Sequence, residues 1–387
     1  MLSTVVTISG GGIIGNYISA RLNTHGINTI VIEKNKNFVS QSEKIRTLTL
    51  NTFSKKLLDE IGIKIPCAEI EDIEVFDGEG SGRIKFNSNE IDEDNLSYVV
   101  FFDDLYRALQ DKEAPRTIFE SEIIEINEDI NDYLCEIILK DMSSYSSVFV
   151  AGCDGRNSNV AKLASLNMQS HDYNQTAITF TANSDNEHDK KAYQVFSERG
   201  IFAIMPSPLG DQKSTHTIVW SIENKNIQDE TSIEEYAKKN LSYFEQKLNI
   251  KIDVCSKFLS FGLTNHYFEK YISKSTVLIG DAAHSIHPLA GQGINLGFAD
   301  ADAFCEEIIQ GHESRKRMNK DLILKRYEIR RKQMNFVMLK SMDFFVEIFK
   351  SNNLLIKLLR NVGLSGVNKI NFLKTFFINH ASGRNRL

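Results

Sequence analysis

The first 33 residues show a strand, turn, helix, strand pattern of apolar and polar positions. Val5, Val6 and Ile8 predict a buried strand, and the apolar residues between 13 and 22 recur at helical spacing. A second apolar run, residues 27–33, predicts another strand. Together these segments predict one βαβ unit of about 30 residues.

The next part of the chain also mixes helical and strand patterns. Residues 46–63, "RTLTLNTFSKKLLDEIGI", predict a loop followed by a helix. Residues 98–110 predict a short strand that enters another helix. Between Arg116 and Cys153, alternating and β-rich segments predict a small meander that returns to the main sheet.

The second half begins rich in strands and ends rich in helices. Residues 177–222 read as strands separated by a Pro/Gly turn, and residues 232–248 predict a helix. The segment "STVLIGD", 275–281, predicts a strand, and the pattern is almost entirely helical from Ala299 onward.

These elements predict an α/β fold in which a Rossmann-like nucleotide-binding domain is interleaved with a β-sheet domain. We expect the nucleotide-binding domain to comprise residues 1–70, 98–165 and 270–320. The β-sheet domain then takes residues 71–97 and 166–269. A C-terminal helical segment, 321–387, follows.

Composition narrows the class of protein. Apolar residues make up 42% and charged residues 25% of the 387 positions, as in ordinary soluble globular proteins. No apolar run approaches the ~18 residues of a membrane span, and we expect no signal peptide. The cysteines are far apart, which favours buried thiols in a reducing compartment over a zinc site or disulfides: Cys67, Cys135, Cys153, Cys255 and Cys305.

The net charge of −6 is unevenly distributed. Residues 311–387 contain 17 Lys and Arg but 5 Asp and Glu, so the first 310 residues carry a net −18. A basic end suggests an anionic partner such as a membrane surface, and nucleic acid is disfavoured because no recognition motif accompanies the charge. The apolar cluster 354–359, with Lys357 and Arg360, fits an interfacial helix. The alternatives are a solvated helix face and a helix packed on the nucleotide-binding domain.

The βαβ unit carries the spacing Gly10-x-Gly12-x-x-Gly15 between its first strand and its helix. In such a turn the three glycines permit a tight bend, close approach of a pyrophosphate, and close packing of helix on strand. Glu33 ends the second strand, where an acid can accept hydrogen bonds from a ribose. The unit therefore predicts a dinucleotide site, and the acid favours FAD or NAD over NADP.

Two further motifs follow predicted strands. "GCDGRNS" contains Asp154 and Gly155, and "VLIGDAAHSIHPLAGQGINLG" contains Asp281 at a strand end. In the latter, Gly291, Gln292 and Gly293 open a helix whose N–H groups can face an electron-rich ring. Each motif alone could be a turn, but all three in this order indicate a bound cofactor.

The combination GxGxxG with its acid, then DGxxS, then GDAAHxxHPxAGQGxNLG resembles the flavin-dependent aromatic hydroxylases of the para-hydroxybenzoate hydroxylase fold. Among these, "HPLAGQGINLGFADADAF" is most similar to the ubiquinone-biosynthesis hydroxylases, the relatives of 2-octaprenyl-6-methoxyphenol hydroxylase. The resemblance covers nearly the whole chain. It departs at Phe101, where the family usually has a polar residue, and at Cys153, where "GADG" is usual.

The resemblance implies a role for each matched residue. Gly10, Gly12 and Gly15 would hold the FAD pyrophosphate, and Glu33 the adenosine ribose. Arg46 would contact the phosphate and ribityl region. The remaining matches are Asp154 and Gly155 for the pyrophosphate and the NAD(P)H path, Asp281 for the ribityl chain, and Gly291, Gln292, Gly293 and Asn295 along the flavin ring.

The resemblance also implies the reaction. NAD(P)H would reduce FAD, and reduced flavin with O2 would hydroxylate a polyprenylated phenol by way of a C4a-hydroperoxyflavin. The candidate catalytic residues are His287 and Pro288, beside the expected flavin, although structural support is an alternative role for His287. No metal is expected. The chain would be cytoplasmic or peripheral on the inner face of the membrane, alone or in a ubiquinone-biosynthesis complex.

Two other functions remain open at this point. One keeps the flavin but acts on another aromatic compound, as a hydroxylase, reductase or halogenase; the single tryptophan, Trp220, disfavours the halogenase motif WxWxIP. The other is an accessory subunit that binds flavin or lipid without turnover. Ring position, prenyl length and the electron donor are not specified by the motifs.

Overall fold

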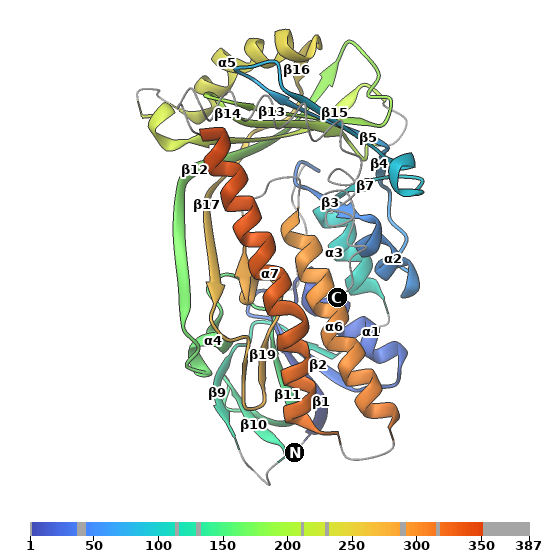
Figure 1. Cartoon of the computed structure of the whole chain (residues 1–387). Coiled ribbons are helices and arrows are strands. Elements are labelled where there is room, and N and C mark those ends of the chain that lie inside the picture. Colours follow the sequence, from blue (N-terminus) through green and yellow to red (C-terminus); the bar gives the residue numbers. More distant parts are fainter. Residues whose placement is uncertain are drawn as a thin grey trace.

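The computed structural model describes residues 2–36, 44–112, 116–128, 133–209, 213–228, 232–286, 292–314 and 318–350. Two large sheets lie toward opposite ends of an elongated molecule, and the long helix α7 (Lys320–Lys350) runs from one toward the other (Figure 1). The expected interfacial helix around residues 354–360 lies outside the described residues.

The first sheet has eight strands, ordered β18-β19-β11-β1-β2-β8, with β10 and β9 joined to β11. Its central strands β19, β11, β1, β2 and β8 are parallel, as the predicted βαβ unit requires. The meander expected between 116 and 153 is confirmed, because β9 and β10 lead back to β11 beside β1. The strands are β1 (Leu2–Ser9), β2 (Thr29–Ile32), β8 (Arg116–Ile118), β9 (Ile123–Asn127), β10 (Cys135–Leu139), β11 (Ser144–Gly152), β18 (Ile272–Ser273) and β19 (Thr276–Leu278).

Helices cover this sheet and bury its apolar face. Val6 and Ile8 of β1 pack in one core with Ile18 of α1 and Phe304 of α6, and all four are fully buried. Burying such side chains stabilises the fold by about 1.5–3 kcal/mol each. These helices are α1 (Ile13–Thr24), α3 (Phe102–Asp111), α4 (Asn159–Leu163) and α6 (Gln292–Glu313).

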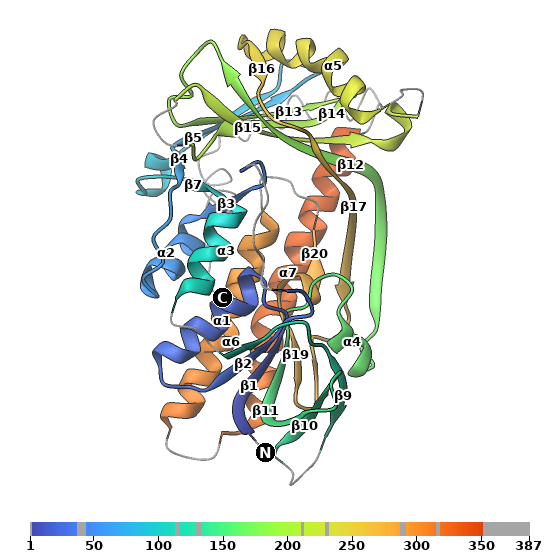
Figure 2. The same cartoon turned by 180° about the vertical axis from the view of Figure 1, so that it is seen from behind.

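The second sheet has nine strands and carries α5 (Ile233–Leu248) on its outer face (Figure 2). Trp220 and Phe202 of the sheet pack against Phe244 of α5, with the two phenylalanine rings stacked at 4.2 Å. Ser232 caps α5, so the helix expected over 232–248 is confirmed. The strands are β5 (Asp72–Asp77), β6 (Arg83–Asn87), β12 (Met168–Ser184), β13 (Lys191–Ser197), β14 (Gly200–Pro206), β15 (Thr215–Glu223), β16 (Ile252–Val254), β17 (Leu259–Phe268) and β20 (His284–Ser285).

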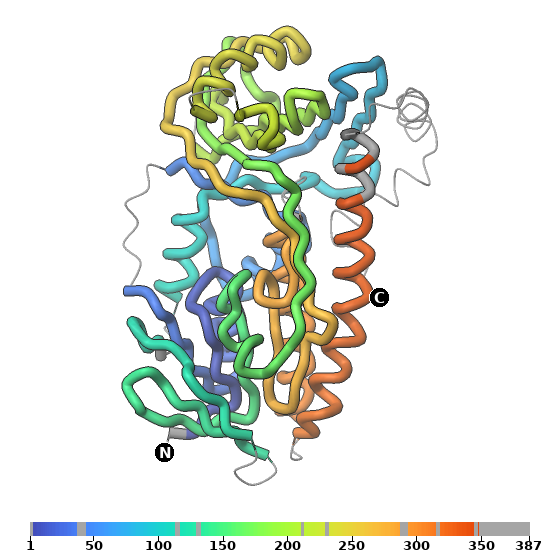
Figure 3. The backbone as a smooth tube through the Cα atoms, turned by 90° about the vertical axis from the view of Figure 1, so that its left-hand side faces the viewer, coloured from blue at the N-terminus to red at the C-terminus, as the bar shows by residue number. Residues whose placement is uncertain are grey.

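The strands β12 and β17 form a long antiparallel ribbon that joins the two ends of the molecule (Figure 3). β12 begins at Met168, well before the strand-rich region expected from residue 177. The early part is polar and exposed, so its sequence lacks the apolar alternation that marks a half-buried strand.

The segment 46–63, predicted to be a loop followed by a helix, begins with a strand instead of a loop. It contains β3 (Thr47–Asn51), which pairs with β7 (Ser97–Phe101) in a three-stranded sheet with β4 (Ala68–Ile70) before α2 (Thr52–Glu60). β-branched Thr47 and Thr49 alternate with Leu48 and Leu50, a pattern that suits a strand. The short helices η1 (Ser88–Ile91), η2 (Asn224–Asn226) and η3 (Gly280–Ala282) complete the described elements.

The cysteines are free thiols, and Cys135 and Cys305 are buried as expected. Cys255 is exposed, contrary to the expectation of buried thiols, because it directly follows the short strand β16. Within the described residues, no helix is both long and apolar enough to cross a membrane.

Candidate functional site

Four parallel strands end at one edge of the eight-stranded sheet, and a motif from the sequence follows each of them. Gly10 follows β1, Glu33 follows β2, Asp154 follows β11 and Asp281 follows β19. The strand register aligns the last residues of neighbouring strands directly. Segments as far apart in sequence as Gly10 and Asp281 thus meet where parallel α/β sheets bind ligands.

The glycine turn needs glycine at two positions and leaves open space at the third. Gly10 has φ of 103°, and a Cβ there would meet the carbonyl oxygen of Cys153 at 2.4 Å. A Cβ on Gly15 would meet the carbonyl oxygen of Gly10 at 2.0 Å. A Cβ on Gly12 would meet nothing within 4 Å. Helix and strand therefore pack tightly, while the backbone at Gly12 stays accessible to a ligand.

The N-terminus of α1 has the backbone chemistry that suits an anion. Gly12 is the N-cap and offers no side-chain cap, and the first turn holds no acidic residue. The free N–H groups and the positive end of the helix dipole face the open side of the turn. A pyrophosphate fits this arrangement.

Glu33 lies beside the turn in a fixed position. The residue is 9% exposed, and Oε2 accepts a hydrogen bond of 2.7 Å from the Gly11 N–H. Oε1 accepts from the backbone and side-chain nitrogens of Asn35, both at 2.8 Å. Because each carboxylate oxygen has two lone pairs, Glu33 can still accept a ribose hydroxyl.

Asp154 has one oxygen engaged and one without a partner. Oδ2 accepts from the N–H groups of Asn159 at 2.8 Å and Val160 at 3.1 Å, and so caps α4. Oδ1 is buried and forms no hydrogen bond. A buried carboxylate oxygen without a partner is rare, so a donor from a bound molecule is the fitting partner. The neighbouring Gly155 has φ of 80° and open space at its Cβ position.

Asp281 and Arg46 are exposed by surface area, yet protein atoms crowd both. This crowding raises the pKa of the Asp281 carboxyl, against the opposing charges of His284, Arg156 and Arg46. It lowers the pKa of Arg46, whose guanidinium lies 4.0 Å from the centre of the Phe102 ring. Side chains that are both exposed and crowded line a recess rather than a convex surface. A ribityl chain and a phosphate suit this pair of opposite charges.

Asp300 is a fully buried carboxylate behind the Asp281 turn. Its Oδ2 accepts from the Gly280 N–H at 3.1 Å and lies 2.6 Å from His284 Nε2. Its Oδ1 accepts from Arg331 Nε at 2.7 Å and from Asn335 Nδ2 at 2.9 Å. Burial alone would raise the pKa of Asp300, but the His284 and Arg331 charges and these hydrogen bonds lower it well below its usual range. The carboxylate therefore joins the Asp281 turn to α6 and α7.

His266 supports the same turn from β17. Its Nε2 lies 2.9 Å from the carbonyl oxygen of Asp281, and its Nδ1 is buried with no hydrogen-bond partner. Burial lowers its pKa to about 4. The ring is thus neutral near pH 7, and Nε2 carries the proton that it donates to Asp281.

This histidine makes stability depend on pH. A folded pKa of about 4 against the ordinary 6.5 means that the unfolded chain binds an extra proton between these values. Its contribution is fully present above pH 6.5 and is lost toward pH 4. We expect His266→Gln to reduce the pH dependence of the unfolding free energy by up to about 1.4 kcal/mol per pH unit. Urea unfolding at a series of pH values measures this.

A second histidine gives an independent arm to the same experiment. Burial also lowers the pKa of His216 to about 4, far from the turn, in β15. His216→Gln should reduce the slope by a similar amount, and the double variant by the sum. Equal slopes in wild type and both variants would mean that these rings are charged in the native state, against their burial.

The α6 end of the site is described in part. Gly293 has open space at its Cβ position. Asn295 is buried, and its Oδ1 accepts from the Asn51 N–H while its Nδ2 donates to the Thr49 carbonyl, both at 2.9 Å. The Asn295 side chain thus fastens α6 to β3. The backbone of Gln292 begins α6, whereas His287, Pro288 and Gly291 lie outside the described residues.

Sequence reasoning found the residues at the strand ends but missed those that support them. Asp300, Arg331, Asn335 and His266 were not singled out, although Asp300 stands within the quoted motif "GFADADAF". The available signal was that Asp300 stands among the apolar residues Phe298, Ala301 and Phe304, which are fully buried. An acid in such surroundings is itself buried and needs hydrogen-bond or charged partners. Phe101 is buried, with the Lys44 ammonium 5.5 Å from its ring centre, and forms part of the core.

The donor set fits FAD on three counts. The open glycine turn at a helix N-terminus suits a pyrophosphate, and the fixed carboxylate of Glu33 suits a ribose. The Oδ1 atom of Asp154, which has no partner in the protein, can accept a hydrogen bond from the cofactor. Among the described residues, no cluster of histidine, cysteine or acidic side chains is arranged to hold a metal ion.

Comparison with known proteins agrees with this chemistry. The chain is similar to 3-demethoxyubiquinol 3-hydroxylase of Escherichia coli (strain K12), with 28% identity over 98% of each chain. It is 27% identical to ubiquinone hydroxylase UbiL of Rhodospirillum rubrum over 99% of this chain and 90% of that one. Its fold is similar to that of p-nitrophenol 4-monooxygenase PnpA from Pseudomonas putida DLL-E4, with a TM-score of 0.76, 16% identity and full coverage of both chains. The family model described as "FAD binding domain" matches residues 3–340, so the chain belongs to that family.

Proposed function

We propose that this protein is an FAD-dependent monooxygenase that hydroxylates the ring of a polyprenylated phenol in ubiquinone biosynthesis, using O2 and NAD(P)H. The observation that carries the proposal is the meeting of the three motifs at one sheet edge. Two relatives that align over nearly the full length of the chain are named for ubiquinone hydroxylation. The weaker alternatives are another aromatic substrate and a non-catalytic accessory subunit.

We propose the following division of labour among the residues. The turn of Gly10, Gly12 and Gly15 binds the pyrophosphate, and Glu33 binds the adenosine ribose. Asp281 and Arg46 hold the ribityl and phosphate region. Asp154, with Gly155, supports the pyrophosphate through its free oxygen. Gly291, Gln292 and Gly293 direct N–H groups of the α6 start toward the flavin ring.

The eight-stranded sheet with its helices is the proposed FAD-binding domain, and the nine-stranded sheet is the proposed substrate domain. β20 belongs by sequence to the first and by pairing to the second, so the Asp281 segment links both. Bound FAD supplies the chemistry of O2 reduction and oxygen transfer. The chain's own residues bind and orient it and exclude water, and His287 and Pro288 are the candidates beside the reacting ring.

The proposed place of action is the cytoplasmic, inner face of the membrane, where a polyprenylated phenol resides. Peripheral attachment, alone or within a ubiquinone-biosynthesis complex, would give the chain access to such a substrate. The basic charge of residues 311–387 supports contact with an anionic surface.

Complementation tests the proposal. The chain is expressed in bacterial strains that each lack one ubiquinone ring-hydroxylation step, and quinones are identified by mass spectrometry. We expect one strain to regain ubiquinone and to lose its stalled prenylphenol, which identifies the ring position as well. Gly12→Ala, which the apoprotein tolerates sterically, should restore nothing.

The opposite result is equally clear. If every strain keeps its intermediate while the protein is soluble and yellow with FAD, the ubiquinone assignment is wrong. NADH or NADPH oxidation stimulated by other phenols would then point to another aromatic substrate. Its absence with all of them would support an accessory subunit.

A further inference from the structure

Helix α7 carries a row of exposed apolar side chains on its outer side. Of the ten exposed large apolar residues in the described part of the chain, four belong to α7: Leu322 is 44% exposed, Ile329 68%, Phe336 46% and Val337 55%. The first three are spaced by seven residues, which places them on one side of a helix. We call the surface formed by these four residues the α7 outer face.

The orientation of this face is fixed by the contacts of the opposite side. Arg331 is bonded to buried Asp300, and the Tyr327 hydroxyl donates to the Leu278 carbonyl at 2.7 Å. These two contacts keep α7 from rotating to bury its outer face, and it lies along one edge of the molecule in Figure 3. Asp343 stands seven residues after Phe336, on the same side as the row, and accepts from the hydroxyl of Tyr173 at 2.6 Å, so the exposed row ends before Asp343.

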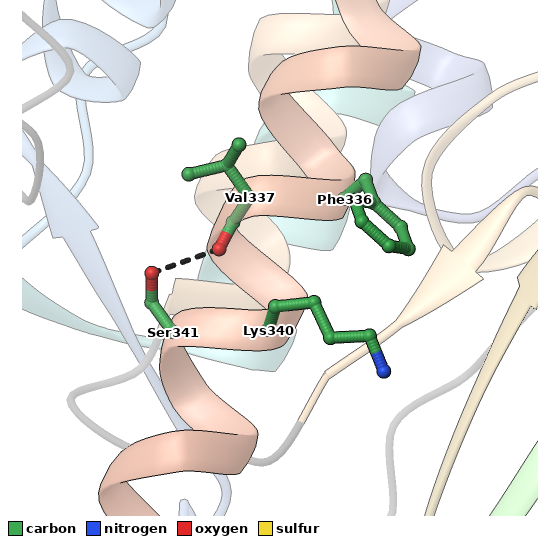
Figure 4. Close-up of a pocket in the computed structure, with 4 residues that line it drawn as sticks. All are labelled: Phe336, Val337, Lys340 and Ser341. Atoms are coloured by element: carbon green, nitrogen blue, oxygen red, sulfur yellow. Dashed lines mark hydrogen bonds between the residues drawn. The ribbon is translucent and has the colours of Figure 1, made fainter.

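A shallow hollow of about 330 Å³ lies on this face. The described residues that line it all belong to α7: Phe336, Val337, Lys340 and Ser341 (Figure 4). The Lys340 ammonium lies 5.7 Å from the centre of the Phe336 ring. Apolar carbon and positive charge thus share the same small area, as they do on interfacial helices.

Cations flank the apolar row along the whole helix. Lys325, Arg326, Lys332 and Lys340 are exposed. In the described part of the chain, Arg326 and Lys340 each have a carboxylate neighbour, Glu307 and Asp343 at 3.7 and 3.8 Å, whereas Lys325 and Lys332 form no ion pair. α7 as a whole has 8 basic and 4 acidic residues, a net charge of +4.

The charge selects among partners for this face. A second copy of α7 would bring the same positive charge, and residues 351–387 contain six basic residues and no acid, so both would be repelled. Nucleic acid would not cover apolar side chains at every second turn. An anionic lipid bilayer satisfies both features, because headgroups pair with the cations while the apolar row enters the interface.

We propose that the α7 outer face is a docking surface for an anionic lipid bilayer, on which α7 lies parallel to the membrane plane. The biological purpose of this docking surface rests on the proposed function, and the surface adds to that function the place where the chain contacts the membrane. The physical contact does not depend on turnover.

The test is co-sedimentation of the full-length protein, loaded with FAD, with lipid vesicles. One set contains phosphatidylcholine and phosphatidylglycerol, and the other contains phosphatidylcholine alone. We expect binding to the anionic set that weakens with salt. The double variant Leu322→Gln/Ile329→Gln should lose at least about tenfold in affinity for the anionic vesicles. Lys325→Gln/Lys332→Gln should also lose about tenfold.

A matched control comes from the other end of the molecule. Ile124 and Met142 are 42% and 72% exposed, close to the values of Leu322 and Ile329, but lie on or beside the β9–β10 meander. Ile124→Gln/Met142→Gln should bind vesicles like wild type. Unchanged melting temperatures show that all variants fold.

Three results would overturn the proposal: no binding to anionic vesicles at low salt, equal binding to both vesicle sets, or undiminished binding by Leu322→Gln/Ile329→Gln. The first result would favour an acidic protein surface as the partner of the α7 outer face. Vesicle binding requires no catalysis, so a chain that binds vesicles but restores no ubiquinone refutes the proposed function and leaves this inference intact. A chain that restores ubiquinone but does not bind anionic vesicles refutes only the inference about the α7 outer face.

Discussion

Gly12→Ala should yield a folded apoprotein that no longer retains FAD. Gly12 has φ of −73° and ψ of −171°, which alanine adopts easily, and its Cβ would meet nothing within 4 Å. The unliganded fold therefore has no reason to weaken. In the bound state, the same methyl group would stand where the pyrophosphate must approach the backbone. We expect FAD binding to weaken about 100-fold, equal to about 3 kcal/mol.

Gly15→Ala is the matched comparison, because it should fail at an earlier stage. Its Cβ would lie 2.0 Å from the carbonyl oxygen of Gly10, a backbone atom that cannot move without opening the turn. Helix α1 would be pushed off β1, so we expect a loss of more than about 3 kcal/mol in stability. Thermal unfolding of the apoproteins separates the two variants, and fluorescence titration with FAD measures their affinity.

The pair distinguishes a cofactor turn from a structural turn. A merely structural turn would make Gly12→Ala indistinguishable from wild type in both measurements. If Gly12→Ala bound FAD normally, the pyrophosphate would not lie against this turn, and the roles proposed for Gly10, Gly12 and Gly15 would be wrong.

The positions of the strand-end residues were predictable because local patterns specify them. A glycine turn between strand and helix, or an acid after an apolar strand, is visible within a few residues of sequence. Parallel pairing of β1, β2, β11 and β19 then brings these segments to one edge without further information. For these strand-end residues, the sequence already shows the chemical groups, and the fold brings them close together.

The residues that hold the site in place depend on long-range contacts, which no local pattern reveals. Asp300 meets Gly280, His284, Arg331 and Asn335, and the last two come from a helix that begins 20 residues later. β3 shows the same limit, since its antiparallel partner β7 lies nearly 50 residues away. The position of an edge strand such as β3, and the partners of a buried carboxylate such as Asp300, depend on tertiary packing rather than on the propensity of the local sequence.

Asp300→Asn should destabilise the protein strongly, because it removes the buried carboxylate that pairs with the Arg331 guanidinium. The side chain is fully buried, and its carboxylate faces Arg331 and His284. Breaking a buried ion pair from one side costs about 3–5 kcal/mol. We expect a loss of that size at pH 7 by urea unfolding. FAD affinity should also fall about tenfold, because the Gly280 N–H that orients the Asp281 turn loses an anionic acceptor.

The pH dependence has a definite sign. The folded pKa of Asp300 is lowered, so its contribution is present above the ordinary carboxyl pKa near 4 and is lost as the pH falls through the folded value. The difference in stability between wild type and Asp300→Asn should therefore be constant near neutrality and shrink in acid. A difference that grew in acid would show that the carboxyl is protonated in the native state.

A double-mutant cycle with Arg331→Met isolates the pair itself. Arg331→Met alone leaves the buried Asp300 carboxylate without its 2.7 Å partner, so it should also destabilise the fold. The double variant should lose less than the sum of the two by about 1–3 kcal/mol. Strict additivity would mean that the two groups act independently, and that α7 does not hold the Asp281 turn through Asp300. Non-additivity in stability together with a shared loss of FAD affinity would instead show that α7 supports the cofactor turn through one buried carboxylate.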